Sequence, residues 1–357
     1  MAGNSNLHMS KSGKTDEFYT QLSTVEEELR HYRKYFKDKV VLCNCDDPYE
    51  SNFFKYFALN FNVLGLKKLI TTCYATSPIT YTQLSLFEGA DIEYPGGEGK
   101  KPYKIEITEV KDENGDSTID LSDVEYLLKN GNNTLTLLKG DGDFRSPECM
   151  ELLNECDIVV TNPPFSLMKE YIPLLAKSGK QFLVLGNMNH ITFKEIFHYF
   201  KDNKMWLGYN SGHFWFKVPD HYEAKGTDYK QDESGQKWRR LGNICWFTNM
   251  DIDIRHQPLD LYKHFDISSN PEYDNYHAFF VSTIADIPCD TDEPLAVPIT
   301  FLSSYSPDQF EILDANEYRK NDSVPLKAHG LIKDKDGTIN GKATYARLLV
   351  KLKSIEK

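Results

Sequence analysis

Apolar positions along the chain change their spacing repeatedly, from short continuous runs to the three- and four-residue spacing of helices. The runs typical of buried strands lie at residues 39–45, 66–74, 135–138, 157–160 and 182–185. Helical patterns begin near residues 24, 51, 147, 166 and 192. This alternation predicts an α/β fold with a mostly parallel sheet and helices on both faces.

Residues 78–133 interrupt the alternation, because they are polar and rich in glycine. Within them, Asn114-Gly115 is a hairpin signal flanked by strand-like residues 104–110 and 117–121. The pattern predicts an antiparallel flap that lies outside the main sheet.

The chain also changes character at both ends. Residues 1–15 are rich in Ser, Asn, Lys and Gly and predict a flexible N-terminal arm. After Trp206 the chain is aromatic and strand-like to about residue 250, and then rich in Asp and Pro. We therefore predict an α/β domain over 16–205, with the flap 78–133 inserted, and a β-rich region over 206–357.

Composition bounds the function. The 357 residues carry a formal net charge of −12, which does not favour a nucleic-acid partner, although a local basic groove stays possible. The seven cysteines form no Cys-x-x-Cys pair, so we expect free thiols, no metal and a reducing, cytoplasmic location. The polar first residues predict no secretory signal, and no apolar run approaches the ~20 residues of a membrane span.

The strongest chemical signal is Asn162-Pro163-Pro164-Phe165, directly after the apolar run 157–161. The carboxyl end of a parallel strand is where open α/β sheets hold ligands. The oxygens of the Asn162 side chain and the Pro163 carbonyl could each accept one N–H of an adenine amine, turning its lone pair toward a sulfonium methyl. Prolines restrict the backbone around these acceptors, and Phe165 offers a stacking face for a flipped base.

Other interpretations of this element stay open. Asn and Pro are common in turns, so the element could simply end a strand. A planar amine in RNA or a protein glutamine amide would suit the same acceptors as adenine. A catalytically inert DNA-binding module on the same fold is a further alternative.

Three segments could hold a cofactor. Residues 44–48 follow a strand and precede the Ser51 helix, whose N-terminus could receive a carboxylate, although an acidic helix cap explains them equally well. Gly140 to Arg145 combines two glycines with acids and Phe144, which suits an adenine ring or a plain turn. Phe18-Tyr19-Thr20 could close the pocket from outside the sheet or belong to the core.

Together these motifs resemble the adenine-specific DNA methyltransferases typified by the EcoRI modification methylase. The resemblance runs from about residue 15 to the end and includes residues 51–57 and 298–302. It implies a Rossmann-like, S-adenosylmethionine-dependent methyltransferase sheet, with residues 206–357 as a target-recognition and C-terminal region. It implies methylation of the N6 amine of a flipped adenine in a short duplex DNA site, by a bacterial or phage monomer paired with a restriction endonuclease.

The resemblance also assigns roles residue by residue. Asn162, Pro163, Pro164 and Phe165 would be catalytic. The cofactor-binding residues would be Phe18, Tyr19, Thr20, Asn44, Asp46, Asp47, Pro48, Asp141, Asp143 and Phe144. The chain lacks the Phe-x-Gly-x-Gly of the wider methyltransferase group and an acid at the end of its second strand, so the ribose-binding residue is not assigned.

Base-edge readout needs Arg, Lys, Asn or Gln side chains. Residues 225–240 are rich in these types, and we predict DNA contacts from Lys225, Lys237, Arg239 and Arg240. Neighbouring acids dilute this charge, so a solvated surface loop is the alternative.

Overall fold

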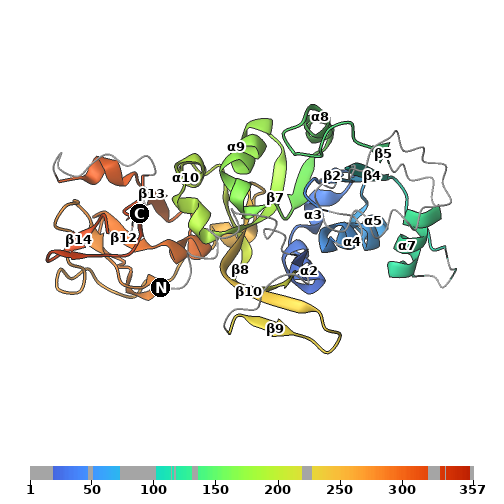
Figure 1. The fold of residues 1–357 in the computed structure, drawn as a ribbon. Coiled ribbons are helices and arrows are strands. Elements are labelled where there is room, and N and C mark those ends of the chain that lie inside the picture. Colours follow the sequence, from blue (N-terminus) through green and yellow to red (C-terminus); the bar gives the residue numbers. More distant parts are fainter. Residues whose placement is uncertain are drawn as a thin grey trace. The chain divides into compact units, whose positions relative to one another are not determined.

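The structure is a computed structural model that describes residues 19–46, 51–72, 102–113, 115, 118–130, 136–218, 227–320, 330–333 and 335–353. The chain divides into two compact units, which are described separately (Figure 1). The first consists of Met1–Met168, Lys177–Gly186 and Gly212–Ile244. The second consists of Lys169–Ala176, Asn187–Ser211 and Cys245–Lys357.

The first unit is built on a large mixed sheet, in the order β1-β8-β10-β7-β6-β2-β3-β4-β5 with β9 on β10. Its strands are β1 (Tyr19–Thr20), β2 (Val40–Cys43), β3 (Lys68–Thr72), β4 (Tyr103–Ile107), β5 (Thr136–Leu137), β6 (Ile158–Thr161), β7 (Gln181–Asn187), β8 (Trp206–Val218), β9 (Tyr229–Gln231) and β10 (Lys237–Thr248). The last residue of β7, the first part of β8 and the end of β10 are assigned to the second unit.

The centre of this sheet is parallel. β2 pairs in parallel with both β3 and β6, and β6 pairs in parallel with β7. The described part of β2 is buried throughout, as expected for a strand with neighbours on both sides. The predicted α/β class is confirmed, but antiparallel pairs at the edges make the sheet mixed rather than mostly parallel.

Helices begin near the starts expected at residues 24, 51, 147 and 166, and further helices that the spacing did not predict also lie between the strands. The helices assigned to the first unit are α2 (Leu22–Leu29), α3 (Arg33–Phe36), α4 (Asn52–Leu59), α5 (Phe61–Leu64), α7 (Leu121–Asn130), α8 (Pro147–Glu155) and the 3₁₀ helix η3 (Phe165–Leu167). α9 (Met168–Ser178) is shared between the two units. Ser51 caps α4 as expected, because its hydroxyl accepts hydrogen bonds from the backbone N–H groups of Phe53 (3.1 Å) and Phe54 (3.4 Å).

The flap prediction is wrong for the described part of residues 78–133. β4 pairs antiparallel with β3 and so belongs to the main sheet. The described residues of the second flap strand, expected at 117–121, form no strand, and α7 begins at Leu121. Asp120 and Asp123 explain this, because Asp120 accepts from the N–H of Ser122 at 2.7 Å and Asp123 accepts from the N–H groups of Glu113 and Asp120, both at 2.9 Å. Polar caps at a helix start outweigh the hairpin signal.

The strand-like region after Trp206 also joins the main sheet. β1 pairs with β8, with Thr20 opposite Phe216, and β9 pairs with the start of β10. We predicted that a separate β-rich region begins at residue 206. This boundary is wrong for Gly212–Ile244, which lies in the same compact unit as β2 and β6. The predicted N-terminal arm, 1–15, lies outside the described residues.

The second unit contains a four-stranded sheet in the order β11-β12-β16-β13 and the small hairpin β14–β15. Its strands are β11 (Phe279–Phe280), β12 (Leu295–Pro298), β13 (Phe310–Ile312), β14 (Thr338–Ile339), β15 (Lys342–Ala343) and β16 (Arg347–Leu352). Its helices are α10 (Lys194–Lys201) and the 3₁₀ helices η4 (Met188–Thr192), η5 (Asp253–His256), η6 (Ile284–Asp286), η7 (Ile299–Ser304) and η8 (Ala315–Tyr318).

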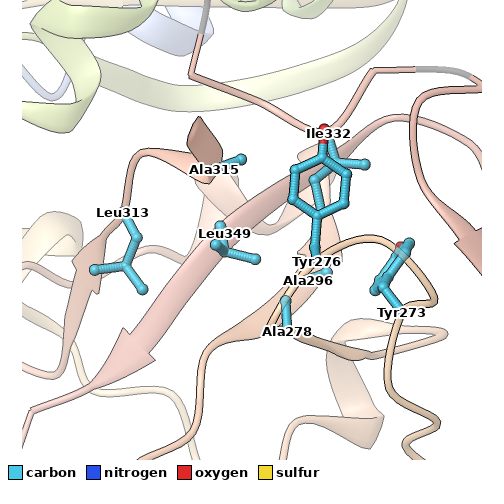
Figure 2. Packing of buried hydrophobic residues seen from close by; sticks show 8 residues of the cluster. All are labelled: Tyr273, Tyr276, Ala278, Ala296, Leu313, Ala315, Ile332 and Leu349. Carbon is cyan, nitrogen blue, oxygen red and sulfur yellow. The ribbon is translucent and has the colours of Figure 1, made fainter. Parts of the chain in front are cut away.

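A buried cluster holds this second sheet against its loops. Figure 2 shows Tyr273, Tyr276 and Ile332 among the clustered side chains, with Ala296 and Leu349 contributed by β12 and β16. Tyr273 and Tyr276 meet edge to face, with ring centroids 6.3 Å apart. Small alanines therefore pack beside large tyrosines in this layer.

Gly337 is the tightest backbone approach to this cluster. A Cβ added there would lie 2.5 Å from a Tyr273 ring carbon and 2.7 Å from an Ile332 methyl carbon. We expect Gly337→Ala to lower the free energy of unfolding by about 1–3 kcal/mol through overpacking. The exposed Lys342→Ala is the control and should change stability by less than about 0.5 kcal/mol in urea unfolding. Equal stability of the two variants would contradict this packing.

Candidate active site

The predicted catalytic element forms a turn at the carboxyl end of β6. Pro164 is extended (φ −57°, ψ 121°) and its carbonyl oxygen accepts from the N–H of Leu167 at 3.0 Å, which starts η3. Among the described residues, no N–H donates to the carbonyl oxygen of Pro163. Asn162 and Pro164 are partly exposed, whereas Pro163 and Phe165 are buried. The turn thus holds its backbone rigidly while the Asn162 position reaches the surface.

This turn lies where the connections of the sheet diverge. The chain leaves β2 for β3 on one side and leaves β6 for β7 on the other side. In parallel sheets such a point leaves a crevice beyond the carboxyl ends of the two strands. The loops after β2 and β6 meet there, because the N–H of Cys45 donates to the hydroxyl of Thr161 at 3.2 Å.

A buried carboxyl group joins the two loops. The Ser51 hydroxyl donates to one oxygen of Asp46 at 2.7 Å, and the Thr161 hydroxyl donates to the other. Asp46 is 6% exposed, Ser51 4% and Thr161 0%. A hydrogen bond to a charged group that is shielded from water contributes more than an exposed one. Asp46 therefore fixes the residue that directly precedes Asn162.

Strand β3 holds the backbone of the same loop. The hydroxyl of Thr71 donates to the carbonyl oxygen of Asp46 at 2.6 Å, and the hydroxyl of Thr72 donates to that of Asn44 at 3.1 Å. Both threonines are buried. Residues 44–46 are thus held by side chains from β3, β6 and the start of α4.

Tyr19 and Thr20 form β1, at the far edge of the sheet order from β5. The Asn52 side chain donates to the carbonyl oxygen of Thr20 at 2.7 Å, which ties β1 to the start of α4. Thr20 is 4% exposed, and its hydroxyl oxygen has no hydrogen-bond partner among the described residues. A buried hydroxyl without a partner costs free energy unless a ligand or water satisfies it.

The loop from Lys139 to Arg145 is held from α8. One oxygen of Glu148 accepts from the N–H groups of Lys139 (2.8 Å) and Gly140 (2.9 Å), and these hydrogen bonds lower the pKa of Glu148. Gly142 has a positive φ of 79°, which favours glycine there. The loop is therefore shaped by one acid and one glycine.

The side chains of this loop are already engaged with one another. Arg145 donates to both oxygens of Asp143, at 2.8 and 2.6 Å, and this lowers the pKa of Asp143. The same guanidinium lies over Phe144, 5.1 Å from the ring centroid, and Phe144 is 4% exposed. Asp141 is exposed and accepts from the N–H of Asp143 at 3.0 Å. Of the predicted cofactor residues here, Asp141 is the most open to a ligand.

The structure thus brings together Asn44, Asp46 and Asn162, and it adds residues that sequence reasoning missed. Thr71, Thr72 and Thr161 share a signal, since each is a threonine at the last positions of an apolar strand. Their partners could not be assigned without the sheet order. Phe18, Asp47 and Pro48 lie outside the described residues, so their predicted roles stay predictions.

The predicted DNA-contact residues fall on β10. Arg239 is 7% exposed, whereas Arg240 is exposed and forms an ion pair with Asp228 at 3.0 Å. Alternation along a strand directs these neighbours to opposite faces. Lys237 is half-buried, and Lys225 lies outside the described residues. A single DNA-contact face could therefore include Arg240 without Arg239.

Known proteins identify the family. The family model described as "Adenine-specific methyltransferase EcoRI" matches residues 6–353. The chain belongs to this family. It is an adenine-specific methyltransferase, and the RNA, protein-glutamine and inert-module alternatives are not favoured.

The chain is similar to three methyltransferases over nearly their full lengths. The chain is 42% identical to the type II methyltransferase M.EcoRI of Escherichia coli, covering 100% of this chain and 99% of that protein. It is 35% identical to M.MgeORF184P of Mycoplasma genitalium (98% and 99% covered) and 33% identical to M.MpnI of Mycoplasma pneumoniae (97% of both). No solved structure matches the chain significantly. In the described part of the chain, every helix is too short or too polar to cross a membrane.

The Asp46–Thr161 hydrogen bond can be tested with a matched pair of variants. Thr161→Val keeps the shape but removes the hydroxyl, which leaves one oxygen of Asp46 without this donor. Since such a bond contributes about 1.5–3 kcal/mol, we expect methyl transfer to slow by roughly 10- to 100-fold in single-turnover assays. Thr161→Ser restores the donor and should recover most of the rate. Equal rates in the two variants would exclude a positioning role for this hydroxyl.

Proposed function

We propose that the protein transfers a methyl group from S-adenosylmethionine to the N6 amine of an adenine flipped out of duplex DNA. The observation that carries this proposal is the position of Asn162 and Pro163, in the loop that Asp46 fixes at the divergence point between β2 and β6. Membership of an adenine-specific family supports the same base.

The proposed chemistry follows from two acceptors. The adenine amine is a weak nucleophile because its lone pair is delocalised into the ring. The side-chain oxygen of Asn162 and the carbonyl oxygen of Pro163 would each accept one of its N–H groups. Because Pro163 and Pro164 restrict the backbone, these oxygens need little rearrangement as charge develops on the nitrogen.

Phe165 can stack on a flipped base only if its ring becomes accessible. Its ring is 6% exposed, so a base that stacks on it must displace the side chains that now cover it. Extruding a base from duplex DNA costs a few kcal/mol, and stacking offsets part of that cost. Phe165 is therefore proposed as one wall of the base pocket.

Three of the residues assigned to the cofactor by resemblance carry polar groups that a polar cofactor could satisfy. The buried hydroxyl of Thr20, which lacks a partner in the described structure, can be satisfied by a ligand with many polar atoms. Asn44 and Asp141 add an amide and an exposed carboxylate, and S-adenosylmethionine would supply the electrophilic methyl when bound. We propose Thr20, Asn44 and Asp141 as direct contacts, with Tyr19, Asp143 and Phe144 lining the site.

Asp46 is better explained as a positioning residue than as a cofactor ligand. Both of its oxygens already accept from hydroxyl groups, and it is almost fully buried. Breaking that arrangement to bind a cofactor would leave Ser51 and Thr161 without their acceptor. The cofactor-side role assigned to Asp46 by resemblance is therefore proposed to be indirect.

The parallel centre of the sheet supports a Rossmann-like fold for the catalytic part. We also propose the finer features that the family suggests, namely action as a monomer on a short duplex site and pairing with a restriction endonuclease. The relatives carry the name type II methyltransferase.

Variants of Asn162 test the proposed function. Asn162→Ala removes one acceptor, and we expect methyl transfer to fall by about 10²–10³-fold while S-adenosylmethionine binding is retained. Asn162→Asp keeps an acceptor oxygen and should retain more activity than the alanine variant. The measurements are calorimetric cofactor binding and transfer of labelled methyl to duplex DNA, RNA and protein.

Sequencing of DNA from cells that express the wild type should show a methylated adenine motif that is lost with Asn162→Ala. Transfer to RNA or protein but not to duplex DNA would refute the proposed substrate. Full activity of Asn162→Ala would refute the proposed mechanism.

A further inference from the structure

One face of the β8, β9 and β10 strands carries aromatic and cationic side chains together. Trp238 pairs with Lys230 across the β9–β10 ladder, which places their side chains on the same face. The Lys230 ammonium lies 4.5 Å from the ring centroid of Trp215 on β8 and 5.7 Å from that of Trp238. We call Trp215, Lys230, Trp238 and Arg240 the indole–cation face.

The same face continues along β8 and β10. The guanidinium of Arg240 lies 5.9 Å from the Trp215 ring centroid. A Cβ added to Gly242 would lie 3.1 Å from the His213 ring, so that ring lies over the glycine. All four residues of the indole–cation face belong to the same compact unit as Asn162, and Figure 1 shows β9 and β10 as an antiparallel ribbon.

The two cations of this face differ in whether a carboxylate neutralises them. Arg240 is paired with Asp228, through Nε at 3.1 Å and a terminal nitrogen at 3.0 Å. Lys230 is exposed, and no carboxylate in the described part of the chain forms an ion pair with it. Asp232, the nearby acid, instead accepts from the indole N–H of Trp238 at 2.8 Å. The Lys230 charge is thus held by aromatic rings and stays available to an anion.

This arrangement suits a phosphate. Two indoles restrict the lysine side chain, so less conformational entropy is lost when the ammonium binds. The whole chain has a formal charge of −12, so its average surface repels anions. A restrained lysine without an ion-pair partner therefore stands out as a local site where an anion can bind. Phosphate contacts position a protein on duplex DNA without reading its sequence.

We infer that the indole–cation face binds the sugar–phosphate backbone of duplex DNA, with Lys230 on a phosphate and Trp215 and Trp238 holding that lysine in place. The inference rests on the proposed DNA substrate. It keeps Arg240 from the predicted contact residues and adds Trp215, Lys230 and Trp238. Arg240 joins the contact by exchanging Asp228 for a second phosphate.

The test measures binding of the full chain to a labelled duplex at several salt concentrations. Lys230→Gln should weaken binding by about three- to tenfold, equally for different duplex sequences, and reduce the steepness of the salt dependence by about one unit. Trp215→Ala should produce most of the same loss, whereas Trp215→Phe keeps a ring and should lose less. The matched control is Lys111→Gln, an exposed lysine beyond β4, the penultimate strand at the opposite end of the sheet order.

Each outcome separates this inference from the proposed function when labelled methyl transfer is measured in parallel. Unchanged affinity and salt dependence for Lys230→Gln, with wild-type methylation of duplex DNA, would overturn the inference and leave the function intact. Equal losses for Lys230→Gln and Lys111→Gln would also overturn it. A loss of duplex binding in Lys230→Gln but not in Lys111→Gln supports the inference. This holds even if the wild-type protein methylates only RNA or protein, a result that would refute the proposed substrate.

Discussion

The buried hydrogen bonds of Asp46 connect the two halves of the candidate site. Ser51 at the start of α4 and Thr161 at the end of β6 both donate to this one carboxyl group. A carboxyl group that is 6% exposed needs such donors, because burial without them would be costly. The requirement fixes the loop after β2 against the loop after β6, and the position of Asn162 follows from it.

The sheet gives this interaction its rigidity. β2 has parallel neighbours on both sides, and β3 sends Thr71 and Thr72 to the backbone of residues 44–46. A loop held from β3, β6 and the start of α4 can keep acceptor oxygens in place during a reaction, which is how preorganised sites lower a barrier.

The ribbon of β8, β9 and β10 shows how an acidic protein can bind an anion. The net charge is a property of the average surface and does not exclude a local cationic site. Lys230, held by two indoles, is such a site. Because the indole–cation face belongs to the same compact unit as Asn162, a contact there could set the position of a duplex relative to the proposed base pocket. Recognition and catalysis would then share one sheet.

The sequence by itself determined the α/β class and the Ser51 cap and pointed to the proposed catalytic element, because apolar spacing, a capping side chain and Asn162-Pro163-Pro164-Phe165 are local properties. Tertiary structure decided what depends on partners far apart in the chain. The pairing of β4 with β3 and the bond from Thr161 to Asp46 could not be derived from spacing, since the order of the strands sets both of them. The strand expected at 117–121 is not formed by its described residues for a related reason, because helix caps and a long-range strand pair together outweigh a local hairpin signal.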